Sequence, residues 1–86
     1  MISSEQIRAA RALVRWEQKD LAAASGVSLP SLKRLETQPG ELAAHARTVE
    51  AIERAFNAAG VIFLQAGDIT DGGAGLRLAK PKGSTE

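Results

Sequence analysis

Apolar residues recur at helical spacing near the start of the chain, directly after residues that commonly cap helices. Ile7 and Ala10 are three positions apart, so they would share one buried face of a helix. Ser3 and Gln6 match the capping-box pattern, in which each side chain accepts a hydrogen bond from the other residue's free backbone N–H. We therefore expect a first helix that begins just after Ser3 and ends near Arg15.

A second, shorter helix is expected over about residues 17–25, where Leu21 and Ala22 form a small apolar face. Gly26 follows it and can adopt the left-handed backbone conformation that ends a helix and turns the chain sharply. Val27 comes next and is expected to pack in the angle between this helix and the one after it.

A third helix has clear signals at both of its ends. Ser28 is a good N-cap residue, and Pro30 falls in the first turn, where its missing N–H costs nothing. Leu32 and Leu35 are three positions apart and are expected to point inward. Pro39–Gly40 prevents the helix from continuing, so we place it over residues 28–36.

A loop or irregular turn is expected over residues 37–46, and a fourth helix after it. We expect Thr48 to cap this helix and Gly60 to end it. Its apolar stripe is the cleanest in the chain and consists of Val49, Ile52, Phe56 and Ala59.

The pattern then changes to that of short strands. Residues 61–64 are all apolar and include β-branched and aromatic side chains, residues 71–73 supply turn chemistry, and residues 76–79 alternate with a period of two. Residues 80–86 are polar and interrupted by Pro and Gly, so we expect a disordered tail. The fold class predicted is mainly α, with four to five short helices and a short C-terminal β-hairpin.

The composition of the chain limits the classes of protein to which it can belong. The chain has 86 residues, a formal net charge of +1 and no cysteine, which leaves room for one modest core and excludes disulfide scaffolds and thiolate metal sites. No basic start leads into an apolar run, and no stretch approaches the roughly 18 apolar residues of a membrane span. We therefore expect a cytoplasmic protein with no membrane partner.

The candidates for catalysis or metal binding are weak. His45 is the single histidine, so no second imidazole or thiolate shares a metal with it. Glu50 and Glu53 lie on the polar side of the fourth helix, and the glycine-rich run at 72–75 lacks the lysine of a phosphate-binding loop. The sequence thus predicts no enzyme, no metal and no cofactor.

Residues 16–36 form two short helices joined by a tight glycine turn, which describes a helix-turn-helix with one face of its second helix free for the DNA major groove. The segment resembles the Xre-type, lambda-repressor-like family of helix-turn-helix transcriptional regulators, and the resemblance covers about residues 5–59. The matching residues are Gln18, Leu21, Ala22, Gly26, Val27, Ser28, Leu32, Leu35 and Glu36.

The resemblance implies a transcription regulator, most commonly a repressor, that binds double-stranded DNA as a homodimer through a domain at residues 1–60. It places Gln18 on a DNA phosphate, Arg34 on a base, Lys33 on a phosphate, and Arg47 near the backbone or the minor groove. Arginine pairs well with guanine O6 and N7. The complete set of DNA-contacting residues that it implies is Gln18, Ser28, Leu29, Pro30, Ser31, Lys33, Arg34 and Arg47.

Two further expectations remain, the first from the same resemblance and the second from an exposed strand edge. Arg11 and Glu36 match a buried ion pair that ties the family's first helix to its third. The family's fifth helix is replaced by the hairpin at residues 61–79, which we expect to be the dimerisation element, because an edge strand can pair with its two-fold mate.

Two other hypotheses stay open. In one, the chain is a protein-interaction module, an antitoxin or antiactivator that holds a second protein through the C-terminal strands, with or without DNA binding. In the other, it is a degenerate helix-turn-helix that only dimerises, in which case replacing Lys33 and Arg34 by alanine would leave its function intact.

Overall fold

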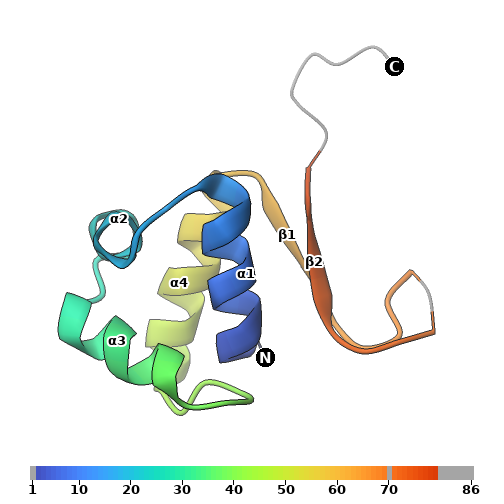
Figure 1. The fold of residues 1–86 in the computed structure, drawn as a ribbon, viewed down its shortest axis with the longest axis horizontal. Coiled ribbons are helices and arrows are strands. Elements are labelled where there is room, and N and C mark those ends of the chain that lie inside the picture. Colours follow the sequence, from blue (N-terminus) through green and yellow to red (C-terminus); the bar gives the residue numbers. More distant parts are fainter. Residues whose placement is uncertain (1, 70, 80–86) are drawn as a thin grey trace.

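A computed structural model describes residues 2–69 and 71–79 of the chain. The described elements are four helices and a two-stranded antiparallel hairpin: α1 Ser4–Val14, α2 Gln18–Ser25, α3 Leu29–Thr37, α4 Ala46–Ala58, β1 Val61–Leu64 and β2 Gly75–Leu78. The helix α1 packs against both α3 and the hairpin, which lie on opposite sides of it (Figure 1). The predicted fold class is confirmed, with four helices in the described residues.

The ends of the first two helices follow the predicted local chemistry. The Ser3 backbone N–H donates to Gln6 Oε1 at 2.9 Å, and the Gln6 N–H donates to Ser3 Oγ at 3.1 Å, which completes the capping box of α1. Arg15 ends α1 in the left-handed conformation, with φ 58°. Gly26 ends α2 with φ 78°, and its N–H donates to the Ala22 carbonyl oxygen.

The start of α4 differs from the prediction. The helix begins at Ala46 with His45 in the N-cap position, and Thr48 already lies inside the first turn, where its N–H donates to the His45 carbonyl oxygen at 2.9 Å. The expectation that Thr48 caps the helix is therefore wrong. The His45 side chain makes no capping hydrogen bond, so the chain carries no capping signal at the true boundary.

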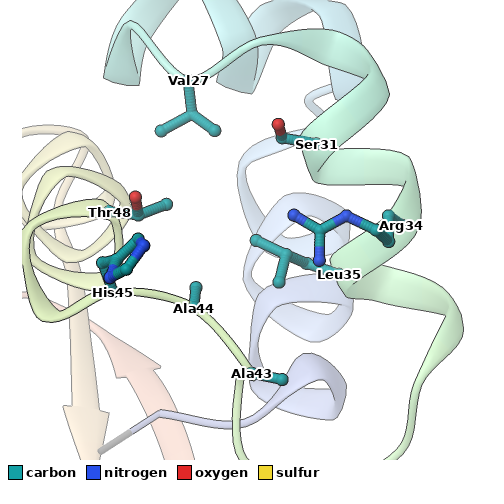
Figure 2. A pocket seen from close by; sticks show the side chains of 8 residues that line it. All are labelled: Val27, Ser31, Arg34, Leu35, Ala43, Ala44, His45 and Thr48. Atoms are coloured by element: carbon teal, nitrogen blue, oxygen red, sulfur yellow. The ribbon is translucent and has the colours of Figure 1, made fainter.

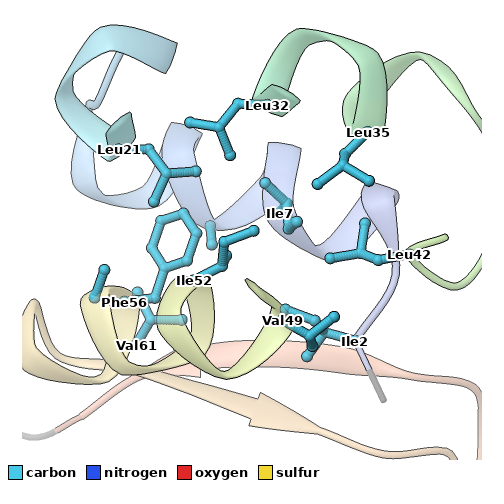
Figure 3. Packing of buried hydrophobic residues seen from close by; sticks show 12 residues of the cluster. Ile2, Ile7, Leu21, Leu32, Leu35, Leu42, Val49, Ile52, Phe56 and Val61 are labelled. Carbon is cyan, nitrogen blue, oxygen red and sulfur yellow. The ribbon is translucent and has the colours of Figure 1, made fainter. Parts of the chain in front are cut away.

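The core lies where α1, α2, α3 and α4 meet, and its largest buried side chain is Phe56 (Figure 3). The Phe56 ring stacks on Trp16 with centroids 5.4 Å apart and meets the edge of Phe63 at 5.8 Å. The predicted stripe of α4 is buried at its first three positions, but Ala59 is a half-buried C-cap and Ala55 completes the stripe instead. Core residues are Ile2, Ile7, Ala10, Leu21, Leu32, Leu35, Leu42, Val49, Ile52, Ala55, Phe56 and Val61.

Replacing Leu32 by alanine is expected to lower the free energy of unfolding by about 2–5 kcal/mol. The Leu32 side chain is completely buried in a core that has few large residues to fill the cavity left behind. Urea denaturation followed by circular dichroism measures the change. Leu13→Ala is the matched control, because the Leu13 side chain is 41% exposed, and its effect should be much smaller.

The side chain of Gln6 hydrogen-bonds α1 to both strands of the hairpin. Gln6 Nε2 donates to the carbonyl oxygens of Leu64 at 3.1 Å and Gly75 at 2.7 Å, one on each strand. The two strands pair in the register Val61↔Leu78 to Leu64↔Gly75, so the second strand lies one residue earlier than residues 76–79. Gly75 belongs to the strand because it is paired with Leu64, which periodicity does not reveal. The tail predicted over residues 80–86 lies outside the described residues.

Candidate nucleic-acid interface

The turn between α2 and α3 is held by side-chain as well as backbone bonds. Ser25 Oγ donates to the Leu21 carbonyl oxygen at 2.7 Å and accepts from the Val27 N–H at 3.1 Å. Val27 is half-buried and packs against the core, as expected for the residue between the two helices. The angle between α2 and α3 is therefore fixed at the turn, and Ser25 is a contributor that the sequence analysis did not identify.

A buried ion pair anchors α3 to α1. Arg11 Nη2 lies 2.7 Å from Glu36 Oε1, and Arg11 Nε donates to Glu36 Oε2 at 2.9 Å, so the guanidinium holds both carboxylate oxygens. The Glu36 side chain is only 4% exposed. The expected Arg11–Glu36 pair is confirmed, and it fixes the rotation of α3 about its own axis.

That rotation leaves one stripe of α3 exposed. Pro30, Lys33, Arg34 and Thr37 are exposed, whereas Leu32 and Leu35 on the opposite side are buried. Thr37 is part of this stripe because α3 runs one residue beyond its predicted end.

The other predicted residues at the start of α3 have local structural roles. Ser28 is the N-cap, with its Oγ accepting from the Ser31 N–H at 3.3 Å and donating to Ser31 Oγ at 2.8 Å. Leu29 is half-buried, so less of it is available at the surface than of Pro30. Ser28 and Ser31 thus use part of their hydrogen-bonding capacity on each other. Both lie at the N-terminal end of α3, where the exposed stripe begins.

Gln18 lies beside the Glu36 side of α3. Its Nε2 donates to Glu36 Oε1 at 3.2 Å, so the Arg11–Glu36 pair also orients this side chain. An amide group has two N–H donors, which leaves one for another acceptor. The position of Gln18 is therefore compatible with the predicted phosphate contact. The Glu36 carboxylate holds the Gln18 side chain in this position.

A groove of about 600 Å³ lies on the other side of α3, between it and the beginning of α4 (Figure 2). The guanidinium of Arg34, the imidazole of His45 and the hydroxyl of Thr48 lie around it (Figure 2). The residues that line the groove are Val27, Ser31, Arg34, Leu35, Ala43, Ala44, His45 and Thr48.

Arg47 joins this surface through an adjoining hollow. It lines a space of about 450 Å³ together with His45 and Thr48, and its side chain is exposed. The groove and the hollow thus bring Arg34 and Arg47 to one side of the molecule. His45 and Thr48 are the interface candidates that the sequence analysis missed. The signal available was that both lie within two positions of Arg47, just before the apolar stripe of α4.

The charge of this surface is positive. Arg34 and Arg47 line the groove and the hollow, and no carboxylate lines either of them among the residues that the structure describes. Arg34 and Arg47 take part in none of the ion pairs found among the described residues. A positive surface with unengaged guanidinium groups is suited to phosphate or to the acceptor atoms of bases.

No protein-family model matches the chain, and no curated protein is significantly similar to it. Among the residues that the structure describes, no group of three His, Asp or Glu side chains is placed to hold a metal ion. In the same part of the chain, no helix has the length and apolarity required to cross a bilayer.

Proposed function

We propose that this protein is a sequence-specific DNA-binding transcriptional regulator, most commonly acting as a repressor, that inserts α3 into the major groove. The observation that carries the proposal is the exposed stripe of α3, which contains Lys33 and Arg34 and is held on a turn of fixed geometry. An α-helix presented in this way fits the major groove of B-DNA, and arginine and lysine read guanine there. This function places the protein in the cytoplasm.

The residues around α3 divide into two kinds of contact. Arg34 and Lys33 are exposed on the stripe, where they reach base edges or the nearest phosphates. Gln18 on one side and Arg47 on the other would bind the sugar-phosphate backbone and set the orientation of the helix. Phosphate contacts of this kind position the helix, and the base contacts supply the sequence specificity.

The first test is the binding of the purified protein to DNA from its own upstream region, compared with random DNA, at two salt concentrations. We expect a specificity ratio of roughly 10³ or more that survives moderate salt. Weak binding to both DNAs that disappears as salt is raised would mean that the protein binds DNA through its positive charge alone. That result would contradict sequence-specific recognition.

Arg34→Ala and Gln18→Ala are expected to change binding in different ways. Loss of Arg34 should relax the base preference at one operator position, at a cost of about 1–3 kcal/mol, whereas loss of Gln18 should weaken all sites uniformly. A competition assay over operators that differ at single positions separates the two. Arg54→Ala is the matched control, because Arg54 is an exposed arginine of α4 almost two turns beyond Arg47. Wild-type behaviour of both variants would reject this docking mode.

We also propose that the protein acts as a homodimer joined through its hairpin. Three large apolar side chains of this region are strongly exposed, Ile62 by 43%, Ile69 by 73% and Leu78 by 48%. Arg77 is the single charged residue of the two strands, so little prevents their edges from pairing with another strand. Because the hairpin and α3 lie on opposite sides of α1, a second copy on the hairpin leaves α3 free for DNA (Figure 1).

The same exposed apolar side chains favour one alternative function. A protein-interaction module would use the hairpin to hold a different protein, such as a toxin or an activator. Copurification from the native host distinguishes the two, because the alternative requires a stoichiometric second polypeptide, whereas the homodimer requires none.

A further inference from the structure

We propose that His45 is a further DNA-contacting residue, which binds a backbone phosphate in the groove between α3 and α4 and makes DNA binding stronger as pH falls. The inference rests on the proposed function, since it concerns a phosphate of the same DNA that α3 reads. It assigns a role to a side chain that neither the capping of α4 nor the packing of the core uses.

The position of His45 within the groove supports the contact. The His45 imidazole, at the N-cap position of α4, and the Thr48 side chain, in its first turn, line the groove from one side, and the Arg34 guanidinium of α3 lines it from the other (Figure 2). These three groups are donors that suit a phosphate, and the remaining lining is largely small or apolar. The groove is thus a concave surface at the edge of the exposed stripe, where the sugar-phosphate backbone would pass if α3 lay in the major groove.

The side chains available in the groove also favour an anion over other ligands. Within residues 2–69 and 71–79, the His45 and Arg34 side chains make no hydrogen bond to another residue, and no carboxylate lines the groove. Ser31 Oγ accepts a hydrogen bond from Ser28 Oγ and keeps its own hydrogen for another acceptor. The described residues of the groove therefore offer donors and no competing anion.

The expected pH dependence follows from the charges around the imidazole. The charged groups facing His45 are Arg34 from α3 and Arg47 from α4, both positive, and the loop residues Ala43 and Ala44 carry no charge. A protonated imidazole donates a charge-assisted hydrogen bond to a phosphate, whereas the neutral ring has no charge to strengthen that bond. Binding is then coupled to proton uptake, so DNA affinity rises as pH falls through the range in which histidines gain charge, about pH 8 to 5.

The test measures affinity for a duplex carrying one operator half-site, selected in the upstream-DNA experiment, at pH 8 and pH 6 and at several salt concentrations. For the wild type we expect affinity to increase by about tenfold at the lower pH, the gain typical of one charge-assisted hydrogen bond. The slope of log K against log salt should steepen by up to about 0.9, the value for one further neutralised phosphate.

The variant His45→Gln keeps a hydrogen-bonding side chain but cannot gain a proton as pH falls. It should therefore bind like the wild type at pH 8 and lose both the pH effect and the steeper salt slope. Arg54→Ala is the control and should keep both. Because His45 is exposed, the substitution should leave the thermal unfolding midpoint unchanged.

Two results would overturn the inference, and they are distinguishable. If His45→Gln retains the wild-type dependence on pH and salt while both proteins discriminate operator from random DNA, His45 is not a contact and the proposed function stands. If the wild type shows no preference for any DNA sequence, the proposed function fails and this inference fails with it.

Discussion

Replacing Arg11 by methionine is expected to lower the free energy of unfolding by about 3–5 kcal/mol. The Glu36 side chain is 4% exposed and accepts two hydrogen bonds from Arg11, so removing the guanidinium leaves a buried carboxylate with only the Gln18 amide as a side-chain partner. A buried charge without its partner is far more costly than a broken surface pair. Urea denaturation followed by circular dichroism gives the change directly.

Two comparisons show whether burial of the carboxylate causes the loss. Lys19→Met breaks the surface pair with Glu17, whose side chains are 73% and 74% exposed, and should cost no more than about 1 kcal/mol. Adding Glu36→Met to Arg11→Met removes the unpaired charge and should recover much of the lost stability. An Arg11→Met protein that unfolds at the wild-type urea concentration would show that Glu36 is not desolvated.

The stability of the protein at acidic pH should depend on a different carboxylate, that of Glu5. The pKa of Glu5 lies below its usual value, mainly because its own backbone N–H and then that of Gly40 donate to the carboxylate. A group with a lowered pKa contributes stability above its ordinary value of 4.5, and that contribution is lost as pH falls through the lowered one. Glu5→Gln should therefore reduce the difference in stability between neutral and acidic pH, as thermal unfolding at several pH values would show.

The sequence predicts those parts of the fold that depend on local chemistry or on a strong pattern. The capping box of Ser3 and Gln6 and the turn at Gly26 each involve only residues that are close together in the sequence. The structure has both features where they are expected. The Arg11–Glu36 pair spans 25 positions and was found through the family resemblance alone, because two charges so far apart give no periodic signal.

The features that the sequence analysis missed depend on contacts between distant elements. Gly75 is a strand residue because Leu64 lies opposite it, and Gln6 reaches the hairpin across 58 and 69 positions of sequence. Thr48 has the chemistry of a cap, yet the packing of α4 places the boundary at His45, which supplies no capping bond. His45 and Arg34 are 11 positions apart in the sequence and line one groove only in the folded chain, so the place of His45 in the candidate site has no counterpart in local sequence.

Replacing Ile62 by glutamate is expected to dissociate the proposed homodimer and to lower affinity for an operator with two half-sites by about 10²–10⁴, the gain that linking two binding modules supplies. Ile62 is 43% exposed and alternates with the buried Val61, so it points away from the core of its own subunit. In its own subunit the new carboxylate would lie opposite Arg77 across the strand pair, and the fold should tolerate it. Sedimentation velocity over a range of protein concentrations measures the dissociation.

The decisive comparison is between DNA with one half-site and DNA with two. A monomer that still presents α3 should bind a single half-site as the wild type does, so Ile62→Glu should reduce affinity for the double site alone. Leu13→Glu is the matched control, because Leu13 is exposed to a similar extent, 41%, but lies on α1 and not in the hairpin, and it should leave the dimer intact. If Ile62→Glu sediments like the wild type and keeps its double-site affinity, the strands of the hairpin do not join the two copies, and their exposed apolar side chains would instead favour a different protein as the partner.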